Sequence, residues 1–64
     1  MHATIKLGVG KAYAHRLVVR LGEKEGDGQE VIIMQTDDLG EAYFALAVAR
    51  RTLNCFPDMS IDEL

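Results

Sequence analysis

The sequence contains no tryptophan, one proline and one cysteine among its 64 residues. The single cysteine, Cys55, excludes a disulfide within one chain, although a domain this small buries only about 60% of its unfolded surface and usually needs such a supplement. A lone cysteine without a secretory signal is typical of a reducing compartment. No segment reaches the roughly 20 apolar residues of a membrane span. These absences predict a cytoplasmic protein with no membrane partner, and they leave oligomerisation as a source of extra stability.

Acidic side chains are missing from the first third of the chain. Residues 1–21 carry four basic side chains and no acidic one, whereas residues 22–64 carry three basic and ten acidic side chains, giving a net charge of −3. The composition is otherwise that of an ordinary globular chain, with 48% hydrophobic and 27% charged residues. The asymmetry favours a polar contact surface or an electrostatic fit between subunits, and it does not by itself indicate nucleic acid.

Three runs with the pattern of β-strands precede a helix. Residues 2–9 and 12–21 alternate apolar and polar side chains, which is typical of strands with one buried face. Residues 30–36 follow a glycine-rich loop and include four consecutive apolar side chains, a pattern expected where both faces of a strand are covered. The expected core face of the first two strands consists of Ala3, Ile5, Leu7, Val9, His15, Leu17, Val19 and Leu21.

Residues 38–55 have the period of a helix. Asp38 is placed to cap its first turn, with Glu41 three residues later as in a capping box. Arg50 and Arg51 fall in the last turns, where positive charge complements the helix dipole. One stripe predicts the face that packs on the sheet and consists of Leu39, Ala42, Leu46, Ala49 and Leu53.

This order of elements predicts an α+β fold in one domain, residues 1–64. We expect a three-stranded antiparallel β-meander followed by one α-helix packed on one face, with residues 56–64 as a short C-terminal tail. The passage Asp37–Ala42 is similar to the helix start of HicB-type antitoxins, where a sheet is also followed by a capped helix. Those proteins have a Pro-Gly-rich connection before the helix, which this chain lacks, so the sequence is assigned to no family.

The sequence offers no signature of catalysis, cofactor binding or metal binding. The segment Gly8–Lys11 lacks both the glycine spacing and the following Ser or Thr of a phosphate-binding loop. His2, His15 and Cys55 are the only candidate ligands for a soft metal, and they lack the paired spacing of structural zinc sites. We therefore expect a protein without enzymatic activity, catalytic residues, cofactor or metal.

Two surfaces are candidates for binding. Phe44, Val48 and Cys55 lie on the helix opposite its core stripe, and Ile32 and Met34 are expected on the outer face of the third strand. Burying one such side chain is worth about 1.5–3 kcal/mol, which is a large share of the stability of a small domain. Their exposure fits a homodimer interface, a site for another protein, or ordinary scattered surface residues.

The second candidate surface is a basic face opposite the core, formed by Lys6, Arg16 and Arg20, with Lys11 in the nearby turn. A positive strand surface can follow a phosphate backbone or an acidic protein, and it can also be an ordinary solvated face. It lacks the aromatic side chains with which sheet-type RNA readers stack bases. The sequence thus predicts a small regulator or inhibitor that dimerises and binds a partner protein, with nucleic-acid binding through the basic face as the alternative.

Overall fold

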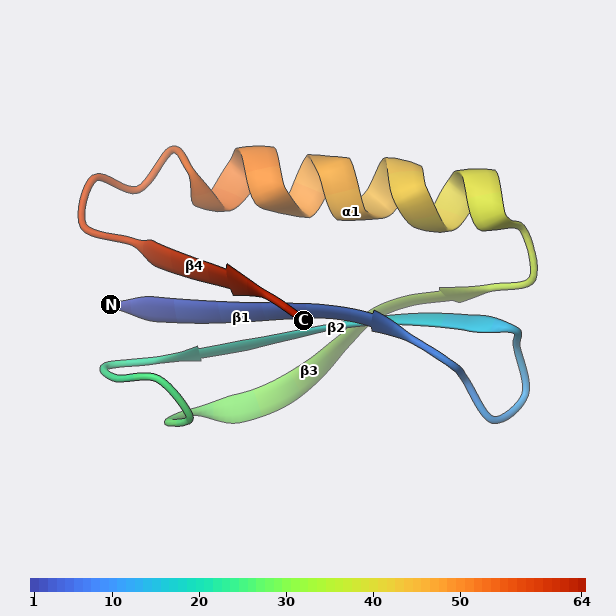
Figure 1. Ribbon diagram of the computed structural model, residues 1–64, viewed down its shortest axis with the longest axis horizontal. Helices are drawn as coiled ribbons and strands as arrows, with labels where there is room; N and C mark the ends of the chain where they lie inside the picture. The colour runs from blue at the N-terminus through green and yellow to red at the C-terminus, as the bar shows by residue number, and fades with distance from the viewer.

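The computed structural model describes residues 1–64 as four strands and one helix. The strands are β1 (His2–Gly8), β2 (His15–Gly22), β3 (Gln29–Thr36) and β4 (Ser60–Glu63), and the helix α1 (Leu39–Leu53) stands between β3 and β4. Figure 1 shows α1 lying along one face of the sheet, while no helix covers the other face. The α+β class is therefore confirmed, and β2 begins three residues later than the sequence predicted.

The predicted three-stranded antiparallel sheet is wrong, because the C-terminal tail supplies a fourth strand. The strand order is β3-β2-β1-β4, with β1, β2 and β3 antiparallel to their neighbours and β4 parallel to β1. The helix carries the chain back from one edge of the sheet to the other, so that β4 enters beside β1 in the same direction (Figure 1). The sheet is mixed for this reason.

The tail becomes a strand because both its backbone and its side chains find partners on β1 and α1. The amide of Ser60 donates to the carbonyl of Met1 at 3.0 Å, and the amide of Leu64 donates to the carbonyl of Ile5 at 2.9 Å. Ile61 packs against the core. These interactions are long-range in sequence, which is why the four-residue segment carries almost no strand signal of its own.

Two side-chain contacts fasten β4 on opposite faces of the sheet, one a hydrogen bond and one an ion pair. His2 Nε2 lies 2.9 Å from Asp62 Oδ2 on the outer face. On the helix side, the guanidinium of Arg50 donates two hydrogen bonds of 2.7 Å to the carboxylate of Glu63. This bidentate geometry is the strongest form of such a pair. Arg50 thereby holds the last turns of α1 over the β4 edge.

The core lies between α1 and the middle of the sheet. Its buried members come from β1, β2 and the end of the helix, and the helix approaches closely because small alanine side chains line the contact. Leu39 was predicted to belong to the stripe of the helix that packs on the sheet. Its side chain remains about half exposed, because Ala42 is the first buried residue of α1. The buried core residues are Ala3, Ile5, Leu17, Val19 and Leu53.

A β-bulge interrupts the pairing of β2 with β3. Leu17 is opposite Met34 and Val18 is opposite Ile32, so Ile33 is the extra residue on β3. An extra residue shifts the alternation of side chains beyond it to the other face. Met34 therefore faces the helix and packs against the core, while Ile32 stays on the outer face. The prediction that both share the outer face is wrong for Met34.

The start of α1 is capped through a buried hydroxyl group. The Asp38 side chain accepts a hydrogen bond from the Glu41 amide at 2.9 Å, as the capping pattern predicted. The second hydrogen bond of a capping box, from the Asp38 amide to the Glu41 carboxylate, is replaced by two bonds through Thr36. The Thr36 hydroxyl group donates to Glu41 Oε1 at 2.6 Å and accepts from the Asp38 amide at 3.0 Å. Thr36 thus links the end of β3 to the helix.

The structure contains no helix with the length and apolar character that crossing a membrane requires.

We expect Thr36→Val to destabilise the fold by about 1–2 kcal/mol. Valine keeps the shape of threonine but leaves the Asp38 amide and the Glu41 carboxylate without this partner. Urea unfolding followed by circular dichroism measures the change. Thr4→Val is the matched control, since Thr4 lies half-buried on the outer face without a side-chain hydrogen bond. Equal midpoints for the two variants would contradict the linking role of Thr36.

The Arg50–Glu63 pair predicts a specific loss of stability in acid. The hydrogen bond from Arg50 is the main cause that holds the pKa of Glu63 below its ordinary value. A carboxyl group with a lowered folded-state pKa stabilises the fold above its unfolded pKa, and this contribution disappears as the pH falls through the folded pKa.

We therefore expect Glu63→Gln to lower the Tm at pH 7 and to reduce the drop in Tm between pH 5 and pH 3. Glu23→Gln, in the exposed β2–β3 loop, is the control with unchanged acid sensitivity. Thermal melts across this pH range measure both variants. A wild-type Tm that falls no more steeply than that of Glu63→Gln would argue against the pair.

Candidate functional site

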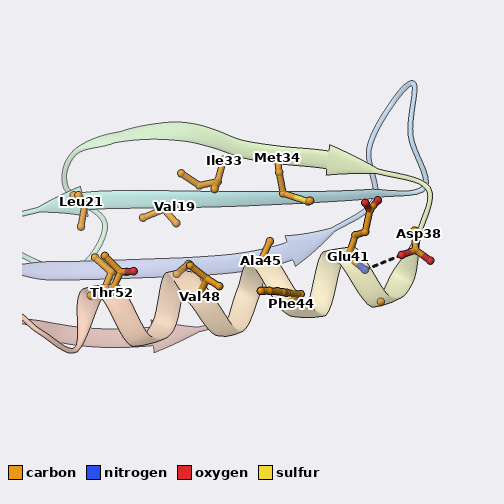
Figure 2. A pocket seen from close by; sticks show the side chains of 13 residues that line it. Val19, Leu21, Ile33, Met34, Asp38, Glu41, Phe44, Ala45, Val48 and Thr52 are labelled. Carbon is orange, nitrogen blue, oxygen red and sulfur yellow. Dashed lines mark hydrogen bonds between the residues drawn. The ribbon is translucent and has the colours of Figure 1, made fainter.

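The largest concave surface is an open apolar groove of about 890 Å³ between α1 and the β2–β3 half of the sheet. Figure 2 shows side chains of the helix on one side of it and side chains of β2 and β3 on the other. Its sheet side consists of Val19, Leu21, Ile33 and Met34. Its helix side consists of Phe44, Ala45, Val48, Ala49, Thr52 and Leu53, with Asp38, Gly40 and Glu41 at the N-terminal end of α1.

The groove exists because one helix is too narrow for this sheet. The axes of four strands spaced about 4.8 Å apart span about 14 Å, and the side chains of the two edge strands widen the sheet further, whereas a helix with its side chains is about 10–12 Å across. The pair between Arg50 and Glu63 holds α1 toward β4. The part of the sheet that carries Leu21 and Ile33 is consequently left without a helix above it.

The exposed apolar side chains of the groove are large. Phe44 is 61% exposed, Val48 50% and Ile33 50%. The surrounding residues are also mostly apolar, so these side chains form one continuous surface rather than scattered single exposures. Contiguous apolar surface of this kind is typical of protein contact sites.

The polar groups at the end of the groove already have structural partners. Asp38 accepts from the Glu41 amide, and Glu41 accepts from the Thr36 hydroxyl group (Figure 2 shows the first bond). No set of polar side chains converges on the groove floor, as a specific small-molecule site requires. The paired carboxylates Asp37 and Asp38 are structural as well, since Asp37 Oδ1 accepts from the amide of Ala14 at 2.8 Å. What the groove offers is apolar contact area.

Three of the five residues predicted as an interface meet at this groove. Phe44, Val48 and Met34 line it together. Ile32 remains on the outer face of the sheet, since the bulge shifts Met34 to the helix side and not Ile32. Its side chain is half exposed there. Cys55 is exposed beyond the end of α1, where its thiol lies 3.5 Å from the carbonyl of Arg51, and it does not line the groove.

Sequence reasoning missed Ile33 and Leu21 as groove residues. Leu21 has the parity of the core face, so the pattern placed it under the helix, which does not extend over it. Ile33 is the bulged residue, and nothing in four consecutive apolar residues marks which of them is the extra one. The partial exposure of β3 could have been inferred from the width of the sheet relative to a single covering helix.

The outer face of the sheet brings the predicted basic residues together but surrounds them with acids. Lys6, Arg16 and Arg20 lie on this face, and Lys11 is exposed in the β1–β2 loop. Arg20 donates to the carbonyl of Gly26 at 3.2 Å and lies 3.9 Å from the carboxylate of Glu30. The shallow hollows of this face are lined also by Glu25, Glu30 and Asp62. The face is thus mixed in charge.

The side chain of His2 lies close to two carboxylates, those of Glu25 and Asp62. Ligand atoms of His2, Glu25 and Asp62 lie within 4.8 Å of one another, a donor set that suits a divalent cation. Two of the three residues, His2 and Asp62, already form the hydrogen bond that holds β4, and no further feature points to a ligand, so no metal site is assigned. His15 and Cys55 are not part of this group.

The comparisons with known proteins give no family to which the chain can be assigned. It matches no family model, no curated protein and no solved structure. The function must therefore be argued from the groove and the two faces of the sheet.

The mixed charge of the outer face predicts weak binding of nucleic acid. We expect mixed-sequence DNA and RNA to bind only at low salt, with little change in Arg16→Glu/Arg20→Glu, because Glu30 pairs with Arg20 and lines the same shallow hollow as Arg16. Fluorescence anisotropy at low and moderate salt measures this. Binding at moderate salt that the double variant abolishes would instead support a nucleic-acid-binding regulator.

Proposed function

We propose that this protein is a small, non-enzymatic binding module that dimerises and regulates or inhibits a partner protein. Its contact surface is the groove between α1 and β3. The observation that carries this proposal is the continuous run of half-exposed apolar side chains, with Phe44, Val48 and Ile33 at its centre, beside polar groups that are already used in capping.

The exposed surface of the whole chain supports the same proposal. The chain exposes 4509 Å². A folded monomer of 7.1 kDa is expected to expose about 4,100 Å². Only eight of the 64 residues are buried. A chain with excess surface and a small core gains stability by covering apolar area with a second chain.

Protein binding is favoured over nucleic acid by the chemistry of the two faces. The groove is apolar and open, whereas the outer face combines Lys6, Arg16 and Arg20 with acidic neighbours. The chain as a whole is acidic, with a pI near 5.1, which opposes long-range attraction to phosphate. An open apolar groove supports regulation by covering a surface of the partner protein.

We expect the wild-type protein to scatter light as a dimer and Phe44→Asp/Val48→Asp to scatter as a 7.1 kDa monomer. Carboxylates at two central apolar positions should raise the dissociation constant at least tenfold. Tyr43→Asp is the matched control, because Tyr43 is 57% exposed on the same helix and does not line the groove.

Circular dichroism verifies that all three proteins are folded. Wild-type protein that stays monomeric at concentrations up to about 1 mM would remove the dimer from this proposal, since weaker association has no stable interface behind it. Loss of the dimer in the Tyr43→Asp control would show that the contact lies elsewhere on the helix.

A further inference from the structure

The exposed side of α1 beside the groove carries four residues at the spacing of a helix-pairing seam. Glu41, Phe44, Val48 and Arg51 follow one another at intervals of three, four and three residues, and all four are exposed. This spacing keeps side chains on one side of a helix and is the repeat by which two helices pack along each other. We call these four residues the outer strip of α1.

The order of residues along the outer strip is self-complementary. Phe44 and Val48 lie at equal distances on either side of position 46, and so do Glu41 and Arg51. If a second copy of α1 runs antiparallel across a twofold axis at this position, each Phe44 meets the partner's Val48. Each Glu41 then meets the partner's Arg51.

The charges at the two ends select this orientation. A parallel pair would place Glu41 beside its own copy and Arg51 beside its own copy, which is repulsive at both ends. In the antiparallel pair the dipoles of the two helices also oppose each other favourably. Phe44 and Val48 supply the apolar centre in either case, so the charged ends decide the direction.

The charged groups are available for such a contact. Arg51 takes part in none of the ion pairs within the chain, whereas the neighbouring Arg50 is committed to Glu63. Glu41 receives the Thr36 hydroxyl group on one carboxylate oxygen, which fixes the side chain and leaves the second oxygen free. Pairing these charges across the contact avoids the larger cost of burying either one without a partner.

The groove provides the room for a second helix. Its helix side includes Glu41, Phe44 and Val48, and its sheet side presents Ile33 and Met34 as further apolar contacts. A helix from a second copy is therefore of suitable size and chemistry.

Pairing through the edge of β3 is the competing way to form a dimer, and the bulge opposes it. The extra residue Ile33 interrupts the ladder in the middle of the strand. Bulges twist an edge strand away from a regular partner and are a common device against edge-to-edge pairing. Contact through side chains of α1 avoids this irregular backbone.

We propose that the groove is occupied by α1 of a second copy of this chain, antiparallel to α1, with Glu41 paired to the partner's Arg51. This inference rests on the proposed function and specifies the geometry of its dimer. It makes the interface isologous, so every contact occurs twice. It also implies that a heterologous partner binds either the remaining surface of the dimer or the groove after dissociation.

Charge reversal with mixing tests this geometry. Glu41→Arg and Arg51→Glu should each weaken the homodimer about tenfold or more, because each places like charges together twice. An equimolar mixture of the two variants should form a heterodimer with nearly wild-type affinity, since both ends then carry opposite charges. Analytical ultracentrifugation measures all three samples, with circular dichroism to verify folding.

A second measurement does not depend on Glu41. In a Cys55→Ser background, Phe44→Cys and Val48→Cys are oxidised separately and then as a mixture. The antiparallel geometry places these two positions opposite each other, so the mixture should form disulfide-linked dimers more readily than either variant alone.

The outcomes separate this inference from the proposal on which it rests. If Phe44→Asp/Val48→Asp dissociates the dimer but the mixture of charge variants does not recover it, the groove remains the contact and the antiparallel seam is wrong. Faster cross-linking of either single-cysteine variant alone than of their mixture would also overturn the seam. A monomeric wild type would remove both the dimer and the seam.

Discussion

A single helix has to cover a sheet of four strands, and this mismatch of widths determines most of what the molecule exposes. The helix buries the apolar residues of β1 and of the middle of β2. It leaves the first part of β3 uncovered, where Val31 and Ile33 are each about half exposed. A core of this size is small even for a chain of 64 residues. The apolar groove is thus a direct consequence of the architecture rather than an added feature.

The position of the helix on the sheet follows from two kinds of contact. Alanines at the helix face allow close approach to the strands, and the bidentate pair of Arg50 with Glu63 holds the C-terminal end near β4. At the other end, Thr36 ties the first turn to β3 through Asp38 and Glu41. The helix therefore crosses the sheet from one edge to the other, and the uncovered area lies beside its middle and its outer strip.

Sequence patterns predicted the elements whose signal is local. The alternation from His2 to Gly8, the capping role of Asp38 and the exposure of Phe44 and Val48 all depend on neighbours within a few residues, and the structure shows them as expected. Val9 was expected to continue the core face of the first strand, but it lies beyond the strand and is exposed. β4 was not predicted, because a strand of four residues is stabilised by β1 and Arg50, which are distant in sequence. The bulge at Ile33 was also beyond the pattern, and it alone changed the face assigned to Met34.

The nature of the groove favours a helix as its occupant over a small molecule. A ligand pocket encloses its ligand and presents a few polar groups that fix orientation, but here Asp38 and Glu41 are used by the helix cap and the floor is apolar. An open groove along a helix instead matches an apolar helical face, with specificity coming from charges at its two ends. The only charged members of the outer strip are Glu41 and Arg51, and they stand at opposite ends of it. Because the chain supplies both halves of this pattern itself, a second copy satisfies the groove without requiring any further recognition chemistry.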